Sequence, residues 1–357
     1  MAIETLILDG FEAYTSVNQM ENDNRWVLIN GYSWNGTLGR ESGACVRYGV
    51  TTLEYGSYLN LPKSVRTVVL GLAIYMDRLP DTEGEFPIRL HSGLYGVPGG
   101  EIQLNLSLGA DGKFRLYRGP HDTGTLLDTG TTVLAVNSWY YIELRAYIDN
   151  TSGEYELKID GSSEFSATAV DTQAHTTDNF VSMVGYWTPE HNPNVSGDYT
   201  VLDDLYVRGD PTANTAGGFL GDVRIVVQKP NANGTNRDWT LSTGTDDFAV
   251  LDDIPPSSTD YAYSSTATDR ITCGMEDLTG SITIKEVALY AHTSIGSSGA
   301  REVKPVCKSG ATTDVGSATR VLQHSYLNPV MYPVDPNTAA AWTLTNLNAA
   351  EFGLEVA

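Results

Sequence analysis

Two segments place aromatic residues beside polar ones in a way that suits sugar binding. The C–H face of a sugar stacks on an aromatic ring, while amide and imidazole groups bond to its hydroxyls. The stretch VGYWTPEHNPNVSGDY (184–199) combines both kinds of group, and NGYSWNGTLGR (30–40) does so less fully. An alternative is that these rings pack beneath long loops. The candidate residues are Tyr186, Trp187, His191 and Asn194 in the first segment, with Tyr32 and Trp34 in the second.

The carboxylates and nucleophiles form no pattern that indicates catalysis. A glycosidase needs two carboxylates about 5 to 9.5 Å apart. Glu154 and Glu156 share one face of a predicted strand that Lys158 continues, which indicates a solvated charged edge. There is no G-x-S-x-G segment, and none of the six histidines stands in H-E-x-x-H spacing. The sequence therefore predicts no catalytic residue and a protein that is not an enzyme.

The chain carries a strong excess of acidic residues. Its 357 residues include 44 Asp and Glu against 22 Lys and Arg, which gives a formal charge of −22. Such a surface repels phosphate backbones and anionic headgroups. No stretch approaches the roughly 20 apolar residues that a membrane span requires. We therefore expect neither a nucleic acid nor a membrane as a partner.

The cysteines and the first residues bear on the compartment. Cys45, Cys273 and Cys307 are odd in number and widely spaced, so they predict no disulfide framework and no metal finger. A bond between Cys273 and Cys307 stays open, although reduced thiols suit a chain that folds in a cytoplasm. The opening MAIETLILDGFEAY has no basic region before its short apolar run, so we expect no signal peptide.

The elements that must position these residues are predicted to be β-strands. The 35 glycines, 20 tyrosines and recurrent short alternating runs indicate an all-β chain. The run SVRTVVLGLAIYMD (64–77) is nearly continuous in apolar residues, as in a strand buried on both faces. In NSWYYIELRAYIDNTSGEYELKIDG (137–161), two strands flank a turn, and the first has aromatic residues on both faces. We expect loops to cover part of its second face.

A segment rich in Gly, Ala and Thr, DPTANTAGGFLGD (210–222), separates two blocks of strand signals. We predict an N-terminal domain over residues 1–209, a linker over 210–221 and a C-terminal domain over 222–357. Each domain is expected to be an antiparallel β-sandwich of the jelly-roll type. The strands predicted for the second domain include VRIVVQKP (223–230), SITIKEVALYAH (281–292), TRVLQHSYL (319–327) and EFGLEV (351–356).

The N-terminal block resembles the concanavalin A-like lectin/glucanase superfamily, in particular its laminin-G-like jelly rolls. The resemblance rests on residues 137–161 and on VLDDLYVRG (201–209), while the E-x-D-x-E pattern of the glucanases is absent. It implies, as in many members, a structural calcium where the first and last strands meet. Asp203 would be the ligand from the last strand, with Asp9 and Glu12 beside it. The alternative is that Asp203 caps a strand edge, and no other cofactor is implied.

The C-terminal block resembles the C-terminal part of tailed-bacteriophage virion proteins. The residues that carry this resemblance are GFLGDVRIVVQKP (218–230), a tryptophan further on, and the ending AAWTLTNLNAAEFGLEV (340–356). It implies a structural protein of the tail, fibre, neck or capsid surface, assembled into the virion in the host cytoplasm. Its partners would be other virion proteins, further copies of itself and a host-surface glycan. The alternatives are a free carbohydrate-binding lectin and a divergent glycoside hydrolase.

Overall fold

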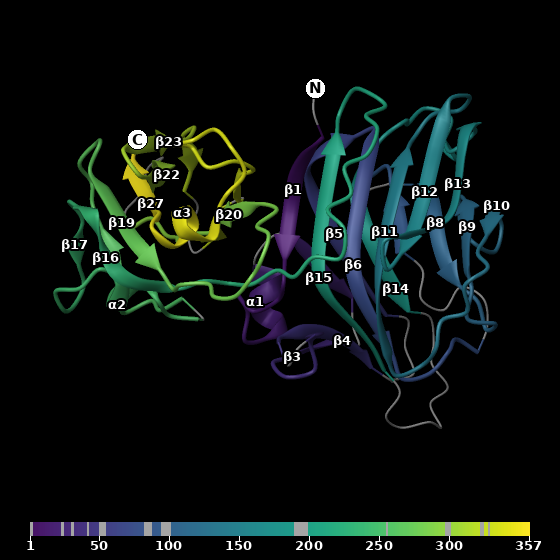
Figure 1. Cartoon of the computed structure of the whole chain (residues 1–357), viewed down its shortest axis with the longest axis horizontal. Coiled ribbons are helices and arrows are strands. Elements are labelled where there is room, and N and C mark those ends of the chain that lie inside the picture. Colours follow the sequence, from purple (N-terminus) through teal and green to yellow (C-terminus); the bar gives the residue numbers. More distant parts are fainter. Residues whose placement is uncertain are drawn as a thin grey trace. The chain divides into compact units, whose positions relative to one another are not determined.

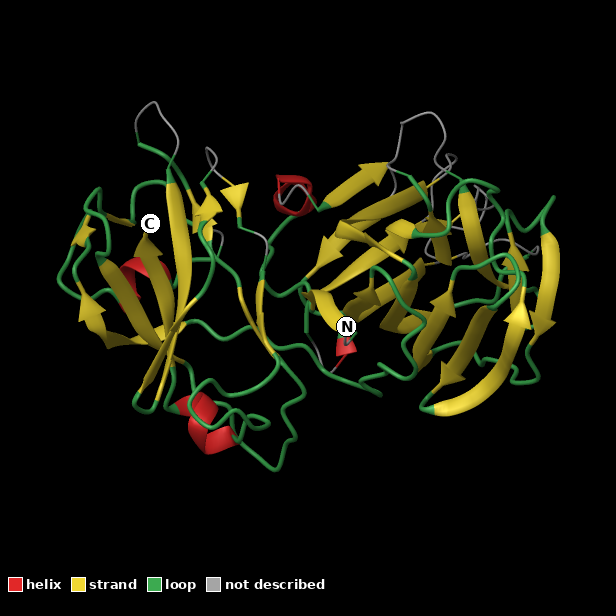
Figure 2. Cartoon of the chain, turned by 90° about the horizontal axis from the view of Figure 1, so that it is seen from above, coloured by secondary structure: helices red, strands yellow, loops and turns green. Residues whose placement is uncertain are grey.

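The structure is a computed structural model of the chain. It comprises two compact units, Met1–Ile225 and Val226–Ala357, and each is described by itself (Figure 1). Antiparallel strands dominate both units, and the described helices are short (Figure 2). The predicted all-β class is confirmed. The structure describes residues 3–22, 25–29, 32–40, 43–49, 55–81, 88–93, 101–188, 199–254, 256–296, 301–321, 325–327 and 329–357.

The first unit is built from two antiparallel sheets and the short helix α1 (Val17–Asn22). One sheet has eight strands in the order β13-β12-β11-β6-β15-β4-β3, with β1 paired to β15, and the other has seven in the order β10-β9-β8-β7-β14-β5-β2. The strands of the eight-stranded sheet are β1 (Glu4–Asp9), β3 (Tyr32–Asn35), β4 (Cys45–Gly49), β6 (Thr67–Met76), β11 (Ser138–Tyr147), β12 (Gly153–Ile159), β13 (Ser162–Val170) and β15 (Tyr199–Asp210). Those of the seven-stranded sheet are β2 (Trp26–Ile29), β5 (Tyr55–Val65), β7 (Ile88–His91), β8 (Ile102–Leu108), β9 (Phe114–Arg118), β10 (Thr125–Thr129) and β14 (Val181–Thr188).

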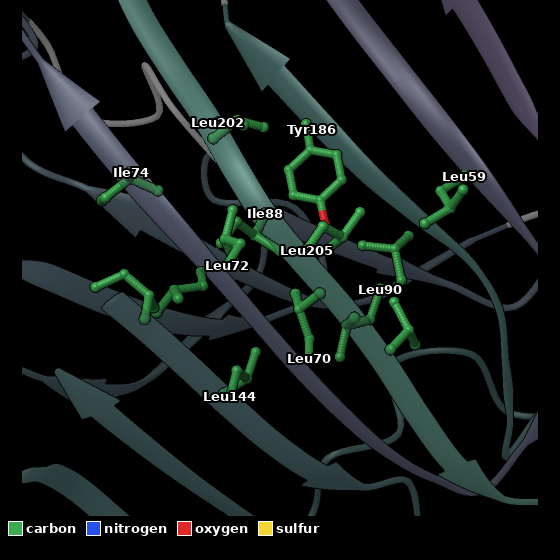
Figure 3. Packing of buried hydrophobic residues seen from close by; sticks show 14 of the residues in the cluster. Leu59, Leu70, Leu72, Ile74, Ile88, Leu90, Leu144, Tyr186, Leu202 and Leu205 are labelled. Atoms are coloured by element: carbon green, nitrogen blue, oxygen red, sulfur yellow. The ribbon is translucent and has the colours of Figure 1, made fainter. Parts of the chain in front are cut away.

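The core of the first unit contains side chains from both sheets (Figure 3). Because alternate residues of a strand point to the same face, Leu70 and Leu72 of β6 and Leu144 of β11 lie together on the inner face of the eight-stranded sheet. Leu59 of β5 and Leu90 of β7 contribute from the seven-stranded sheet. Each buried side chain of this kind contributes about 1.5 to 3 kcal/mol relative to an exposed one. This layer therefore holds the two sheets together.

Residues 137–161 form the predicted strand pair. Strands β11 and β12 are antiparallel, with Ile142 opposite Ile159, and the other edge of β11 runs along β6, with Ile142 opposite Leu72. Strand β6 is buried along nearly its whole length, as its continuous apolar run predicts. The centre of the eight-stranded sheet is therefore covered on both faces.

The outer cover of that sheet is the segment of residues 211–225, here called the strap. Its Phe219, Leu220 and Val223 pack on a second apolar cluster, which includes the buried rings of Tyr141 and Tyr206. Tyr141 belongs to the second face of β11, so the cover expected for that face is present. The aromatic residues on both faces of β11 thus serve two different layers of packing.

Hydrogen bonds fix the strap to the sheet beneath it. The backbone N–H of Gly221 donates to Oε1 of Glu143 at 2.9 Å, and the hydroxyl of Tyr206 donates to the same oxygen. The guanidinium of Arg145 donates to the carbonyl of Thr215 at 3.0 Å. The segment predicted as a linker, residues 210–221, therefore lies within the first unit, and the division of the chain falls after Ile225.

The strand predicted from VRIVVQKP (223–230) does not form as one element. Residues 223–229 have no strand pairing, and β16 begins only at Pro230. The backbone N–H of Ile225 donates instead to Oδ1 of Asp204 at 2.8 Å, while Val226 and Val227 are exposed. Val223 and Ile225 therefore belong to the last residues of the strap, and Val226 and Val227 are the first residues of the second unit.

The second unit centres on a six-stranded antiparallel sheet of order β16-β19-β27-β22-β23, with β24 paired to β22. One apolar cluster of this unit contains Cys307, Trp342 and Phe352. Glu355 of β27 forms ion pairs with Arg270 at 2.6 Å and with Lys304 at 3.0 Å. The sheet contains β16 (Pro230–Arg237), β19 (Arg270–Met275), β22 (Glu302–Ser309), β23 (Thr312–Val315), β24 (Thr319–Arg320) and β27 (Glu351–Val356). Short pairs and helices complete the unit: β17 (Thr240–Leu241) with β18 (Ala262–Tyr263), β20 (Val287–Leu289) with β26 (Val330–Tyr332), β21 (His292–Thr293) with β25 (Ser325–Tyr326), α2 (Phe248–Leu251) and α3 (Leu344–Asn348).

All three cysteines are buried free thiols. Cys273 and Cys307 lie on β19 and β22, which flank β27, and both stand opposite Phe352 in the register. A whole strand therefore separates them, and they do not form the disulfide that the sequence left open. None of the described helices is long and apolar enough to cross a membrane.

Candidate functional site

Polar side chains line up across the outer face of the seven-stranded sheet. In β8, Leu104 and Leu106 point into the core, so Asn105 between them points outward. The register places Asn105 opposite Tyr117 of β9 on one side and Arg89 of β7 on the other. His91 follows two residues after Arg89 and shares its face, and Tyr58 of β5 continues the line. We call the set formed by Tyr58, Arg89, His91, Asn105 and Tyr117 the polar row.

Three members of the polar row are buried although they are polar. Tyr58 is 6% exposed, His91 is 7% exposed and Asn105 is fully buried. Within the described part of the chain, Nε2 of His91 and Nδ2 of Asn105 have no hydrogen-bond partner. An unpaired buried polar group costs about 1 to 3 kcal/mol. The two atoms therefore mark a place where a polar ligand would supply missing hydrogen bonds.

A glycine leaves space in the middle of the polar row. Gly185 of β14 stands between Arg89 and Tyr58 in the register. A Cβ added at Gly185 would lie 3.0 Å from ring atoms of Tyr58 and 3.2 Å from Nε2 of His91. The imidazole of His91 meets the Tyr58 ring edge-on, with centroids 5.5 Å apart. Because Gly185 has no side chain, no Cβ crowds Nε2 of His91.

The imidazole of His91 is neutral at physiological pH. Burial, reinforced by the positive charge of Arg89, lowers the pKa of His91 to about 3. A neutral imidazole has one N–H donor and one acceptor nitrogen. His91 can therefore exchange hydrogen bonds with a ligand hydroxyl without carrying a charge.

A loop borders the polar row beyond β8. Gln103, on the same face as Asn105, accepts from the backbone N–H of Ala174 at 2.8 Å and donates to the carbonyl of Asp178 at 2.6 Å. Ser92, which follows β7, donates to Oδ2 of Asp178 at 3.1 Å. These contacts hold residues 174–178 against β8 and the end of β7, alongside the middle of the row.

The residues predicted to bind sugar occupy different surroundings. Tyr186 is 2% exposed in the core, where its ring lies 6.4 Å from that of Trp26. It therefore points away from the outer face rather than lying in a surface loop. The backbone of Trp187 belongs to β14, but its side chain lies outside the described residues, as do His191 and Asn194.

Tyr32 and Trp34, the second predicted pair, lie on β3 and pack against the core as half-buried side chains. The indole N–H of Trp34 donates to the carbonyl of Phe11 at 3.0 Å, and the ring of Tyr32 meets that of Tyr48 edge-on. Both rings thus have structural partners, as the packing alternative described. The structure brings neither of them into the polar row, which lies on the other sheet.

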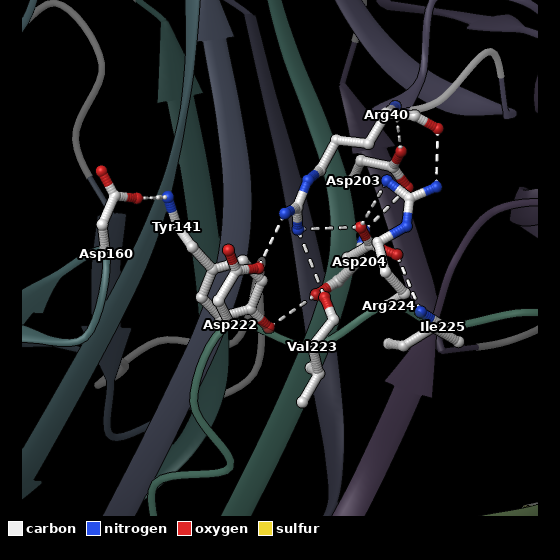
Figure 4. A network of polar contacts seen from close by, with 9 residues as sticks. All are labelled: Arg40, Tyr141, Asp160, Asp203, Asp204, Asp222, Val223, Arg224 and Ile225. Carbon is white, nitrogen blue, oxygen red and sulfur yellow. Dashed lines mark hydrogen bonds and ion pairs between the residues drawn. The ribbon is translucent and has the colours of Figure 1, made fainter. Parts of the chain in front are cut away.

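Asp203 and Asp204 of β15 belong to a polar network that includes the last residues of the strap (Figure 4). Asp204 pairs with Arg40 at 3.1 Å and with Arg224 at 3.3 Å, and it also accepts from the backbone of Ile225. Asp203 accepts from the backbone N–H groups of Arg40 and Asp204, at 2.8 and 2.7 Å. Asp204 therefore joins three segments of the first unit and is committed to structure.

Glu12 lies close to Asp203, and it forms no ion pair with the residues that the structure describes. Its Oε2 is buried without a hydrogen-bond partner in the described part of the chain. Burial first, and then the neighbouring charge of Asp203, raise the pKa of Glu12 to about 8. Two carboxylates held together in this way would be stabilised by a bound cation.

Backbone oxygens lie beside these two carboxylates. A Cβ added at Gly39 would lie 2.7 Å from Oδ2 of Asp203, 2.7 Å from the carbonyl of Gly43 and 2.3 Å from that of Ala44. A Cβ at Gly43 would lie 2.7 Å from Oε1 of Glu12. Calcium takes six to eight oxygen ligands, which include carbonyls and water. The residues present therefore fit a calcium ion, although no three His, Cys, Asp or Glu side chains among the described residues form a metal-binding group.

Asp9, the third predicted ligand, is already satisfied by other groups. Its carboxylate accepts from the backbone N–H of Phe11 at 3.0 Å, and from the Tyr14 hydroxyl and the Trp26 indole N–H, each at 3.1 Å. These donors, and Arg25 nearby at 3.9 Å, occupy its oxygens. The fit to calcium therefore rests on Glu12 and Asp203 and does not include Asp9.

Sequence reasoning missed the polar row because its members come from four separate strands. The local signal was present in QLNLSL (103–108), where polar residues alternate with leucines. A polar residue at every second position, opposite the core face, indicates an outer face with polar function or solvent contact. Only the register of β7, β8 and β9 shows that Arg89, Asn105 and Tyr117 meet.

No family model and no curated protein match the chain. Solved structures match its β-sandwich at low identity. A protein of unknown function with a galectin-like fold, from Bacillus subtilis, is 12% identical, covering 58% of this chain and 97% of its own, with a TM-score of 0.42. The alginate lyase Aly36B is 12% identical over 58% and 98%, with a TM-score of 0.41. The CBM2 module of Lactobacillus casei BL23 phage J-1 evolved Dit is 11% identical over 60% and 98%, with a TM-score of 0.39.

The prediction that the chain is not an enzyme is contradicted by these comparisons. Structures similar to it include two polysaccharide lyases and an endo-1,3-β-glucanase. The absence of one glucanase pattern excludes one arrangement of carboxylates, whereas catalysis on a related fold can use other groups. The fold itself is an all-β sandwich of antiparallel sheets.

The buried, neutral state of His91 predicts a pH dependence of stability. Its folded pKa of about 3 lies below the unfolded value near 6.5, so the unfolded chain binds more protons between these pH values. Stability is therefore lost as pH falls through this window, by at most about 1.4 kcal/mol per pH unit from this one group. We expect His91→Gln to show a shallower loss than the wild type between pH 6 and 4, measured by urea unfolding. Equal slopes for the two proteins would contradict the assignment.

Proposed function

We propose that the protein binds a carbohydrate chain through the polar row of the seven-stranded sheet. The observation that carries this proposal is a pair of buried hydrogen-bonding atoms that have no partner among the described residues, Nε2 of His91 and Nδ2 of Asn105. Sugar hydroxyls both donate and accept, so one hydroxyl group suits either atom. The aromatic rings of Tyr58 and Tyr117 lie on the same face and offer surfaces for sugar C–H groups. A ligand reaches Asn105 by displacing the partly exposed side chains of Tyr117 or Arg89.

The strand arrangement suits an extended ligand rather than a single sugar. The row crosses β9, β8, β7, β14 and β5, and neighbouring strands lie about 4.8 Å apart. Tyr117 and Tyr58 are therefore separated by four strand spacings, or roughly 19 Å. A chain of several sugar residues would span this distance.

Binding is tested by screening the full chain on a glycan array and titrating each positive by calorimetry. Asn105→Leu removes the amide at nearly constant volume, and we expect at least tenfold weaker binding, or about 1.4 kcal/mol. Gly185→Ala should weaken binding because its Cβ crowds Tyr58 and His91. Tyr32→Ala, on the other sheet, is the control and should bind as the wild type does.

Unchanged affinity in a folded Asn105→Leu variant would reject the polar row as the site. Loss of binding in Tyr32→Ala alone would instead favour the pair of β3. The same mixtures are examined for shortened chains, because cleavage of the ligand would show that the site also acts on what it binds.

We also propose that Glu12 and Asp203 hold a structural calcium ion near the junction of β1, β15 and the loop around Gly39. Bound calcium would neutralise the two carboxylates and join segments far apart in the sequence. Because a ligand that binds only the folded state stabilises it, calcium should raise the melting temperature.

Glu12→Gln and Asp203→Asn should each abolish the calcium-dependent rise in melting temperature and the heat of calcium binding in calorimetry. Asp9→Asn is the matched control, since Asp9 is satisfied by protein donors; it should lower stability yet keep the calcium response. A wild-type protein that gives no heat and no shift with calcium would reject the metal.

A role as a structural part of a tailed-phage virion is proposed from the sequence resemblance of residues 218–230 and 340–356. Immunogold electron microscopy of purified particles should place the chain at one defined location, together with neighbouring virion proteins and further copies of itself. Absence of label on intact and disrupted particles would reject the virion role. It would leave the polysaccharide proposal standing as that of a free lectin, because the two rest on different residues.

A further inference from the structure

Two tyrosines of the second unit are exposed side by side. Tyr261 and Tyr263 are 47% and 52% exposed, and no other aromatic side chain that the structure describes is as exposed as either. Their ring centroids lie 5.9 Å apart, with planes tilted by 51°. Single exposed apolar residues need no explanation, but adjoining aromatic rings on a polar surface indicate a contact site.

The backbone fixes the positions of both rings. Strands β17 and β18 pair, with Thr240 opposite Tyr263. Next to this pair, the backbones of Ser242 and Tyr261 are joined by the Ser242 N–H, which donates to the Tyr261 carbonyl at 2.8 Å. The Tyr261 N–H donates in turn to Oγ of Ser242, also at 2.8 Å. Since Tyr261 and Tyr263 are two residues apart on one strand edge, their side chains project to the same side.

The surroundings of this tyrosine pair are acidic. Residues 238–269 contain seven aspartates and neither lysine nor arginine. Two of the aspartates, Asp238 and Asp260, lie two residues before β17 and β18, respectively.

The nearest basic residues in the sequence offset only one of these seven aspartates, Asp247. Arg237 pairs with Asp247 at 2.7 Å, and Arg270 pairs with Glu355 at 2.6 Å. The field around the tyrosine pair is therefore negative, and it attracts cations rather than the anionic partners that the whole chain already repels.

We infer that Tyr261 and Tyr263 form a docking surface for a lysine- or arginine-bearing segment of a partner protein. An ammonium or guanidinium group is attracted to the face of a tyrosine ring, and the neighbouring aspartates add charge complementarity. Tyrosine is also among the residues that dominate the energetics of protein interfaces. This inference concerns the second unit alone and is independent of the polar row.

The probe is a fluorescein-labelled peptide of four Gly-Arg repeats, titrated with the full chain by anisotropy at 50 and 150 mM NaCl. We expect the double variant Tyr261→Ala/Tyr263→Ala to bind about tenfold more weakly at both salt concentrations. The double variant with Phe in place of both tyrosines should bind as the wild type does, because the rings remain. Asp260→Asn should also weaken binding.

Asp122→Lys supplies the charge control, since Asp122 is an exposed aspartate of the first unit. It should change the affinity less than twofold at 150 mM NaCl. Equal affinities for the wild type and the folded Ala variant, or an equal loss in Asp122→Lys, would overturn the inference, because attraction to the acidic chain as a whole would then explain binding. Sedimentation that shows a self-association abolished by the Ala substitutions would also overturn it, in favour of a second copy as the occupant.

Discussion

Strand β6 is apolar on both faces, and the need to cover both faces organises the first unit. Leu70 and Leu72 face the core shared with the seven-stranded sheet, whereas Val69 and Ala73 face outward. If either face were in contact with water, a large apolar surface would stay exposed. Each Å² of that surface would cost about 25 cal/mol of folding free energy. The strap supplies the second cover, and its hydrogen bonds to Glu143 and Arg145 allow a polar backbone to lie on an apolar sheet.

The two sheets therefore divide their work. The outer face of the eight-stranded sheet is used for packing beneath the strap, which leaves buried tyrosines and carboxylates there in structural roles. The outer face of the seven-stranded sheet instead carries the polar row. Asn105 and His91 are buried on this face as well, and their unpaired atoms are those that the proposed ligand would satisfy. The calcium proposed at Glu12 and Asp203 would belong to the eight-stranded sheet, where it would have a structural role.

Periodic patterns of apolar and polar residues predicted the strands whose burial follows from the sequence of the strand itself. The alternation in residues 137–161 and the apolar run of β6 each correspond to one observed strand arrangement. Tyr186 could not be placed in this way, because its polar neighbours suggested a loop and only the pairing of β14 shows which face it occupies. The strap has the Gly and Thr content of a linker, and its few apolar residues find their partners only in three dimensions. The polar row is assembled by register across strands, which spacing along the chain does not encode.

The strap also defines which part of this molecule could be inherited as a module. Recombination that exchanged residues 1–209 between genes would separate the sandwich from its own cover and leave the rings of Tyr141 and Tyr206 against unrelated sequence. An exchange that ended after Ile225 would carry the cover along with the face that it fits. The glycine-rich segment and the outer surface of β6 and β11 are therefore constrained to evolve together, although the composition of the segment resembles that of a freely replaceable spacer.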